Sequence, residues 1–197
     1  MAKLYFHYGA MNAGKSMILL QAAHNYTERG MGVLLLKPEI DNRDSETGEI
    51  VSRIGIRKQA IKFDTDENLE QYIADYAQQN DLHCIFLDEA QFLTRDQVWQ
   101  LAAIADRLSM PVICYGLRTD FQGNLFEGSA ALLALADNVR EIKTLCWCGR
   151  KATMNLRTNA AGLPVKDGDQ IVIGGNDRYI SLCRQHWREV KVTRTKN

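Results

Sequence analysis

The eight residues from Gly9 to Ser16 have the composition of a loop that binds phosphate. They read Gly-Ala-Met-Asn-Ala-Gly-Lys-Ser and fit the pattern G-x-x-x-x-G-K-[ST] without a mismatch. Such glycines let backbone N–H groups converge on an anion at a helix N-terminus, where the helix dipole also favours negative charge. Lys15 would reach the β- and γ-phosphates, and the Ser16 hydroxyl would bind Mg²⁺. The predicted nucleotide-binding residues are therefore Gly9, Ala10, Met11, Asn12, Ala13, Gly14, Lys15 and Ser16.

Two adjacent carboxylates could complete this site. Asp88 and Glu89 follow directly after the apolar run Cys84 to Leu87, which reads as a buried strand. Residues that leave a strand in succession point in different directions, so Asp88 can face Mg²⁺ while Glu89 faces the attacking nucleophile. The pair alone leaves open whether Glu89 activates water, as in an ATPase, or a substrate hydroxyl, as in a kinase.

Four residues near the C-terminus have the composition of a closed zinc site. Cys146 and Cys148 form one pair, and Cys183 and His186 form a second. Three thiolates and one imidazole satisfy tetrahedral Zn²⁺ and leave no position for water, which indicates a structural metal. The first pair is C-x-C, although C-x-x-C is the more usual spacing, and unliganded thiols beside a packed histidine are the alternative. Two further cysteines, Cys84 and Cys114, lie in apolar runs and are expected in the core.

The elements that must position these residues alternate between strand and helix up to about residue 143. Strand patterns cover residues 3–8, 33–37, 84–87 and 112–115, and the sheet is expected to resume near residue 61. Helical patterns follow Ser16, continue through Leu69 to Tyr76, and begin again at Thr94, which has capping-box spacing to Gln97. Residues 41–58 are predicted to be a mobile loop followed by a short strand through Ile54 and Ile56. The pattern predicts an α/β fold with a parallel sheet.

The chain changes in character after residue 143. Short strand-like pieces and glycine-containing turns follow, with a polar loop over residues 158–170. We therefore expect a nucleotide-binding domain over residues 1–143, a small zinc-binding domain over residues 144–190, and a frayed tail over residues 191–197.

Composition weighs against several functional classes. The 197 residues carry 24 Lys plus Arg and 24 Asp plus Glu, so the formal charge is zero, whereas a dedicated nucleic-acid binder usually has a basic stripe. The sequence shows neither an apolar run of about 18 residues nor the apolar region of a signal peptide, so we expect a cytoplasmic protein that does not bind membranes. Five cysteines in a reducing compartment are more consistent with metal ligands and core residues than with disulfides.

The motifs occur together in an order that resembles the type II thymidine kinase family. The resemblance covers nearly the whole chain. The segments that carry it are Gly9 to Ser16, Asp88-Glu89-Ala90-Gln91-Phe92, residues 115–121, the two metal-ligand pairs, and the Gly-Gly-x-x-x-Tyr run of residues 174–179.

This resemblance implies a RecA-like α/β domain, a small zinc-bearing β domain, and transfer of phosphate from ATP to the 5′-hydroxyl of deoxythymidine. It also implies a homotetramer, dTTP as a feedback inhibitor, and Glu89 as the general base, with Asp88 and Gln91 on the ATP side. Asp41 and Arg43 match a family loop that approaches phosphate or a neighbouring subunit. The residues that the resemblance places around the nucleoside are Phe92, Leu117, Phe121, Ile171, Val172, Ile173, Gly174, Gly175 and Tyr179.

Two other functions fit parts of the sequence. A small P-loop ATPase or GTPase switch with a structural zinc ribbon would use Glu89 to orient water, but the N-K-x-D signature that reads guanine is absent from the sequence. A zinc-ribbon nucleic-acid module fused to a nucleotide-binding domain would need clustered Lys and Arg for phosphate contacts, which neutral charge disfavours. Measuring ADP production with and without deoxythymidine distinguishes the kinase from the ATPase or GTPase switch and from the nucleic-acid module.

Overall fold

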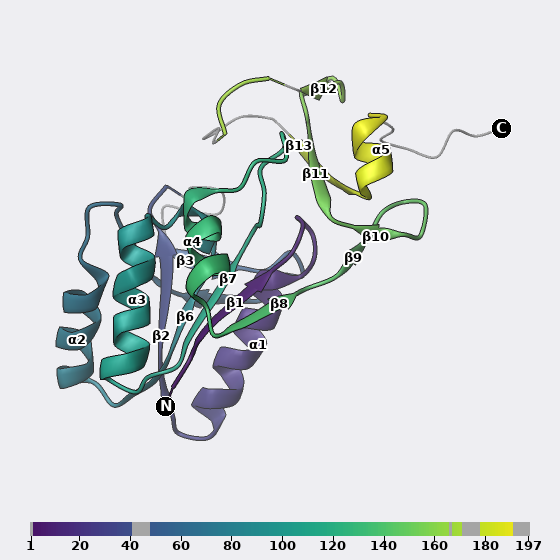
Figure 1. Cartoon of the computed structure of the whole chain (residues 1–197). Coiled ribbons are helices and arrows are strands. Elements are labelled where there is room, and N and C mark those ends of the chain that lie inside the picture. Colours follow the sequence, from purple (N-terminus) through teal and green to yellow (C-terminus); the bar gives the residue numbers. More distant parts are fainter. Residues whose placement is uncertain (1, 41–47, 166, 171–177, 191–197) are drawn as a thin grey trace.

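The central sheet of the protein has six strands, all parallel. A computed structural model describes residues 2–40, 48–165, 167–170 and 178–190 (Figure 1). Across the sheet the strands run in the order β5 (Ile61–Phe63), β2 (Gly32–Pro38), β6 (Leu82–Leu87), β7 (Val112–Gly116), β1 (Leu4–Tyr8) and β8 (Asn138–Glu141). The predicted α/β class is confirmed, and the carboxyl ends of all six strands meet at one edge.

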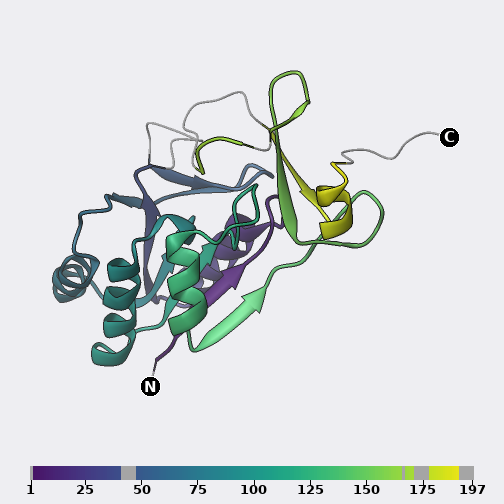
Figure 2. The same cartoon turned by 45° about the horizontal axis from the view of Figure 1, so that its top comes forward.

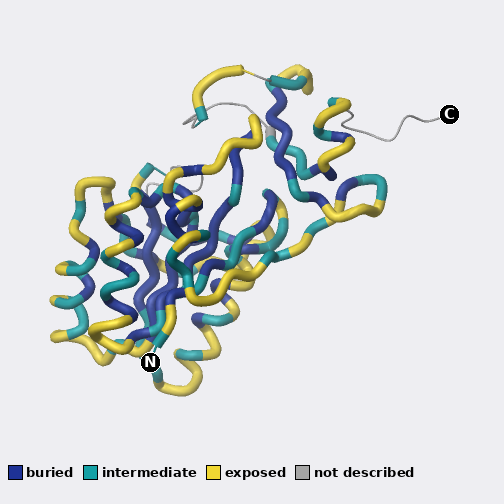
Figure 3. The backbone as a smooth tube through the Cα atoms, viewed as in Figure 1, coloured by how far each residue is buried: buried dark blue, intermediate teal, exposed yellow. Residues whose placement is uncertain are grey.

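Helices cover both faces of this sheet. One face packs against α2 (Leu69–Gln79), α3 (Arg95–Arg107) and α4 (Glu127–Leu135), and the other packs against α1 (Lys15–Glu28). Successive side chains of a strand point to opposite faces of the sheet, so both faces can be apolar. In β6, Ile85 and Leu87 are buried towards α2, α3 and α4, whereas Cys84 and Phe86 are buried towards α1. Figure 3 shows the resulting column of buried strands between exposed helix surfaces. Among the described residues, no helix combines the length and the apolar character that crossing a bilayer requires.

Most of the predicted elements occur, with boundaries shifted by one or two residues. The capping box of Thr94 and Gln97 is present at the start of α3. The predicted strand through Ile54 and Ile56 is wrong, because these residues lie in the turn between β3 (Glu49–Val51) and β4 (Arg57–Gln59), where they are 67% and 49% exposed. Gly55 has a φ of 88°, and the Ser52 hydroxyl accepts a hydrogen bond from the Ile56 N–H, so this segment closes a hairpin. Residues 41–47 of the predicted mobile loop, and the tail from residue 191, lie outside the described residues.

The C-terminal part has its own small core. Its elements are β9 (Thr144–Leu145), β10 (Lys151–Ala152), β11 (Met154–Thr158), β12 (Pro164–Val165), β13 (Arg178–Leu182) and α5 (Arg184–Arg188). Strand β11 lies between β12 and β13, and both pairings are antiparallel. The predicted polar loop over residues 158–170 thus contains a strand, β12. Figures 1 and 2 both place β11 and β13 beside the phosphate-binding loop at the end of β1.

Candidate functional site

The predicted phosphate-binding loop connects β1 to α1. Lys15 is the first residue of the helix, and its buried Nζ atom donates to the carbonyl oxygens of Ala10 at 3.1 Å and Gly9 at 3.5 Å. Asn12 and Gly14 have positive φ angles of 64° and 84°, which give the loop its tight course. Backbone N–H groups at the start of α1 therefore lie beside a lysine cation, which is an arrangement suited to a phosphate chain.

Asp88 lies at the end of β6, next to the phosphate-binding loop. Its side chain is only 5% exposed and accepts a hydrogen bond from the Ser16 side chain. Burial and the neighbouring Glu89 carboxylate raise the pKa of Asp88, and the hydrogen bonds from Ser16 and from the Glu89 N–H oppose this rise. The two predicted magnesium-binding side chains are thus brought together, and their hard oxygen atoms are the kind of ligand that Mg²⁺ prefers.

Glu89 has an unusual backbone conformation and a fixed side chain. Its φ is 51°, in the left-handed region that a glutamate seldom adopts and that often marks functional sites. The Nε2 of Gln91 donates to a Glu89 carboxylate oxygen at 2.5 Å, and the Oε1 of Gln91 accepts from the Leu117 N–H at 2.9 Å. Because Gln91 is only 2% exposed and held at both ends, it limits where the carboxylate can point.

Two glycines let the segment that carries Glu89 pack closely. This segment continues as the short 3₁₀ helix η1 (Ala90–Phe92). A Cβ atom at Gly116 would lie 2.9 Å from Gln91 Oε1, and a Cβ atom at Gly128 of α4 would lie 2.6 Å from the Ala90 carbonyl oxygen. Neither contact is possible for another residue unless the segment moves, so β7 and α4 together fix the position of η1.

The residues predicted to surround the nucleoside come from three elements. Phe92 of η1 packs edge-on against Phe126, with 5.8 Å between the ring centroids. Leu117 and Phe121 follow β7 and are buried, and the Arg157 guanidinium lies 5.1 Å from the centroid of the Phe121 ring. Tyr179 is the β13 residue paired with Arg157. The other predicted residues, Ile171, Val172, Ile173, Gly174 and Gly175, lie outside the described residues, as do Asp41 and Arg43.

The four predicted zinc ligands form one compact cluster. Their donor atoms all lie within 4.8 Å of one another. The Nδ1 of His186 is 3.3 Å from Cys146 Sγ and 3.5 Å from Cys183 Sγ, and the Sγ atoms of Cys148 and Cys183 are 4.0 Å apart. Bonds of about 2.3 Å to sulfur and about 2.0 Å to nitrogen would separate the donors of a tetrahedron by about 3.5 to 3.8 Å. The cluster therefore fits a structural Zn²⁺ site, and the C-x-C spacing does not prevent convergence.

The surroundings of the cluster favour a metal-binding thiolate. Burial raises the pKa of the Cys146 thiol, but hydrogen bonds from the backbone of Cys148 and Cys183 and from the His186 side chain outweigh it and lower that pKa to about 6. The indole ring of Trp147 stacks on His186 with centroids 4.1 Å apart, which fixes the plane of the imidazole. Cys84 and Cys114 are fully buried in the main core, as predicted.

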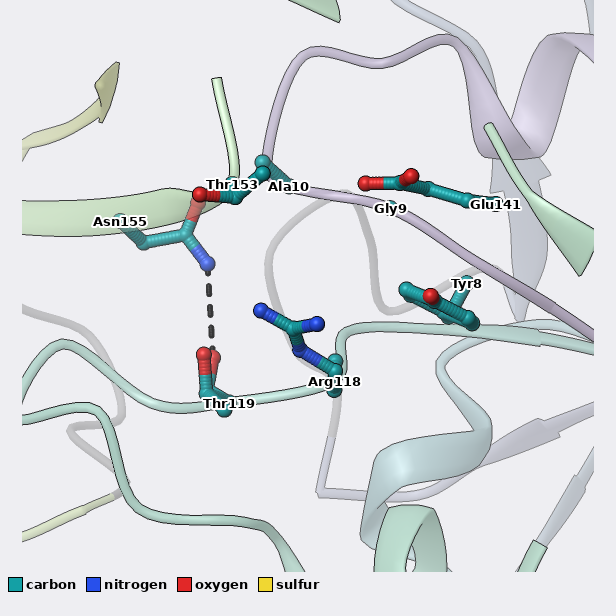
Figure 4. A pocket seen from close by; sticks show the side chains of 8 residues that line it. All are labelled: Tyr8, Gly9, Ala10, Arg118, Thr119, Glu141, Thr153 and Asn155. Carbon is teal, nitrogen blue, oxygen red and sulfur yellow. Dashed lines mark hydrogen bonds between the residues drawn. The ribbon is translucent and has the colours of Figure 1, made fainter. Parts of the chain in front are cut away.

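A small cavity lies between the start of the phosphate-binding loop and the C-terminal part. Figure 4 shows the Arg118 guanidinium inside it, with Asn155 and Thr119 to one side and Glu141 to the other. The Arg118 guanidinium also lies 5.6 Å from the centroid of the Tyr8 ring. The residues that line the cavity are Tyr8, Gly9, Ala10, Arg118, Thr119, Glu141, Thr153 and Asn155.

Sequence analysis missed the residues that join the two parts of the chain. The Oδ1 of Asn155 accepts from the Met11 N–H at 2.8 Å, although 144 positions separate these residues. The hydroxyl of Ser181 donates to the Met11 carbonyl oxygen. An asparagine and a serine inside short strands carry no motif, so nothing in the sequence pattern distinguishes them from other polar strand residues.

Comparison with known proteins gives a consistent result. The family model described as thymidine kinase matches residues 2–187. Curated thymidine kinases of Rhodopirellula baltica and Ruegeria pomeroyi are each 56% identical to the chain over 189 residues, which is 96% of this chain and 89% and 95% of the relatives. The thymidine kinase of Pasteurella multocida is also 56% identical, over 96% of this chain and 98% of its own length. The chain therefore belongs to the thymidine kinase family.

Proposed function

We propose that the protein transfers the γ-phosphate of ATP to the 5′-hydroxyl of deoxythymidine, giving dTMP and ADP. In this reaction the 5′-oxygen forms a bond to the γ-phosphorus, the bond from that phosphorus to the β,γ-bridging oxygen breaks, and the hydroxyl proton passes to a base. The family membership of residues 2–187 supports the reaction. The observation that carries it is one restrained carboxylate, Glu89, which follows directly after Asp88, the residue that accepts a hydrogen bond from Ser16 of the phosphate-binding loop.

Glu89 would accept the 5′-hydroxyl proton. A general base must lie within hydrogen-bonding distance of the proton it removes, so its orientation matters as much as its basicity. The hydrogen bond from Gln91 restrains the Glu89 carboxylate, and the Leu117 N–H restrains Gln91 in turn. We therefore assign Gln91 a positioning role next to Glu89, although the family resemblance places it on the ATP side.

The loop from Gly9 to Ser16 would hold the phosphates of ATP. Backbone N–H groups at the start of α1 would donate to phosphate oxygens, and Lys15 would neutralise the β- and γ-phosphates. Ser16 and Asp88 would hold Mg²⁺, which in phosphoryl transfer neutralises the charge that develops on the phosphate oxygens. The hydrogen bond between Ser16 and Asp88 supports this pairing.

Phe92, Leu117, Phe121 and Tyr179 would form the apolar part of the nucleoside site. Aromatic and aliphatic side chains suit the flat faces of a base. We propose that Tyr179 and the backbone around residues 171–175 hold the nucleoside, as the family resemblance implies. By the same resemblance, Asp41 and Arg43 approach phosphate or a neighbouring subunit.

The wider organisation is also a proposal. We propose a nucleotide-binding domain over residues 1–143 and a zinc-bearing domain over residues 144–190, because the parallel sheet ends with β8 at Glu141 and a separate core follows. We propose a cytoplasmic homotetramer that dTTP inhibits. The location is expected from the sequence pattern, whereas the tetramer and the inhibition are supported by the family resemblance alone.

One experiment tests the activity. Purified protein is incubated with ATP and Mg²⁺, with and without deoxythymidine, and ADP and dTMP are measured together. Equal amounts of both products, formed only with the nucleoside, are expected. Deoxythymidine-independent release of ADP and phosphate would instead identify an ATPase, and absence of turnover with zinc-loaded protein would reject both.

A further inference from the structure

Met11 in the phosphate-binding loop is held by the C-terminal part of the chain at both of its backbone polar groups. Its N–H donates to Asn155 Oδ1 at 2.8 Å, and its carbonyl oxygen accepts a hydrogen bond from the Ser181 hydroxyl. Asn155 is only 3% exposed, so its side chain has little freedom to leave Met11. Asn12, the next residue, has a φ of 64°, and this strained conformation needs support from its surroundings.

Asn155 and Ser181 belong to one face of a two-stranded ribbon. They are direct partners in the antiparallel pairing of β11 with β13, so their side chains share a face. The opposite face, with Leu156 and Leu182, packs into the small core beside the zinc-ligand cluster. The ribbon therefore lies between that core and the phosphate-binding loop.

The same face of the ribbon contacts the proposed nucleoside site at its other end. Two positions further along, Arg157 pairs with Tyr179, and the Arg157 guanidinium lies 5.1 Å from the centroid of the Phe121 ring. Alternate strand residues point to the same side, so Asn155 and Arg157 share a face, as do Ser181 and Tyr179. One pair of strands thus contacts the phosphate-binding loop at one end, and at the other end it carries Tyr179 and places Arg157 against Phe121.

Further hydrogen bonds tie the ribbon to the segment after β7. The Asn155 Nδ2 lies 3.4 Å from the Thr119 carbonyl oxygen (Figure 4), and the indole N–H of Trp187 is shared between the carbonyl oxygens of Asn155 at 3.2 Å and Phe121 at 3.1 Å. A shift of Phe121 on binding a base would therefore move groups that are bonded to Asn155.

We propose that Asn155 and Ser181 are positioning residues that couple the nucleoside site to the phosphate-binding loop, so that deoxythymidine increases the affinity for ATP. The inference depends on the proposed function. Nucleoside binding would fix the ribbon, the ribbon would fix Met11, and the loop would then lose less freedom when it binds phosphate. Because coupling between two binding equilibria is reciprocal, ATP increases the affinity for deoxythymidine by the same factor.

The test is a binding cycle with the full-length, zinc-loaded protein. Calorimetric titration gives the Kd of a non-hydrolysable ATP analogue with Mg²⁺, alone and at saturating deoxythymidine. The ratio of the two values is the coupling factor, for which about 5 to 150 is typical of allosteric proteins. We expect a factor in this range for the unmodified protein and a factor near 1 for the double variant Asn155→Ala, Ser181→Ala. The Kd of the analogue alone should change much less than the coupling factor.

A matched control separates coupling from stability. Leu156→Val shortens a buried side chain in the same strand but on the opposite face, so it should lower the melting temperature and leave the coupling factor unchanged. If the double variant does not fold, Ser181→Ala alone removes a single oxygen atom and is expected to lower the factor.

Each outcome is decisive. A coupling factor of 1 in an unmodified protein that phosphorylates deoxythymidine would overturn the inference and leave the proposed function intact. Retention of the full factor by a folded Ser181→Ala protein and a folded double variant would also overturn it. Failure of the unmodified protein to bind or phosphorylate deoxythymidine would instead reject the proposed function.

Discussion

The side chain of Gln91 donates a hydrogen bond to the Glu89 carboxylate at 2.5 Å, and its carbonyl oxygen accepts one from the Leu117 N–H. A neutral amide thus connects the proposed general base to the segment that carries the proposed nucleoside residues Leu117 and Phe121. The proposed general base Glu89 and the proposed nucleoside site are both positioned by the buried side chain of Gln91, so a change in one of them should affect the other.

Glu89→Gln should nearly abolish phosphoryl transfer. The amide keeps the shape of the side chain but cannot accept the 5′-hydroxyl proton, and loss of a general base costs about 10² to 10⁴-fold in rate. Initial rates of dTMP formation measure the effect, and titration of an ATP analogue should give an affinity close to that of the unmodified protein. The exposed Glu28 offers a control, because Glu28→Gln should leave the rate unchanged. A Glu89→Gln protein with the original kcat would exclude the assigned role.

Gln91→Leu should lower both activity and stability. The change removes the acceptor of the Leu117 N–H and the hydrogen bond that Gln91 donates to the Glu89 carboxylate. A buried donor that loses its partner costs about 1 to 3 kcal/mol, which denaturant unfolding can measure. We expect kcat to fall about tenfold or more, because a barrier change of about 1.4 kcal/mol corresponds to tenfold. A loss of stability with unchanged kcat would show that Gln91 supports only the fold.

Lys15→Ala should weaken both ATP binding and turnover. Lys15 is the cation of the phosphate-binding motif, and removal of one charge-stabilising donor typically costs about 10² to 10³-fold in rate. The Kd of an ATP analogue and the kcat of dTMP formation are measured on the same preparation, together with the melting temperature. A Lys15→Ala protein with the same Kd for the ATP analogue and the same kcat as the unmodified protein would contradict the assignment of the loop to phosphate binding.

Cys183→Ser should release the metal and loosen the C-terminal part. Metal binding free energy is also folding free energy for a site without a large core. Elemental analysis should find about one zinc per chain in unmodified protein and in a Cys84→Ala control, but much less in Cys183→Ser. We expect the KM for deoxythymidine to rise much more than the KM for ATP. Less than about half a zinc per unmodified chain, purified without chelator, would show that the four residues only pack together.

Local patterns predicted the parts of the site that are contiguous in sequence. The strand before Gly9 and the helix after Ser16 follow from hydrophobic periodicity, and the Cys and His spacing predicted a cluster that the structure confirms. The turn at Ile54 was missed because apolar residues in a short segment suggest a strand, whereas Gly55 and the Ser52 side chain favour a turn.

Other features depend on contacts between distant segments. The hydrogen bonds of Met11 to Asn155 and Ser181 follow from the way two separate cores pack together, and no periodicity encodes that arrangement. The bridge made by Gln91 likewise requires η1 and the end of β7 to approach each other, which depends on the strand order of the sheet.

The close approach of Gly128 to the Ala90 carbonyl oxygen, where a Cβ atom would lie 2.6 Å away, has a consequence for mutational tolerance. A methyl group there would press on η1 and displace Glu89, while the buried surface of α4 would remain almost the same. Substitutions at this position should therefore survive a screen for expressed, folded protein and fail a screen for growth that depends on salvage of the nucleoside. Variants at Gly128 would then be depleted by the second selection alone. Such depletion would not be expected at a residue that neither binds a substrate nor supports the core.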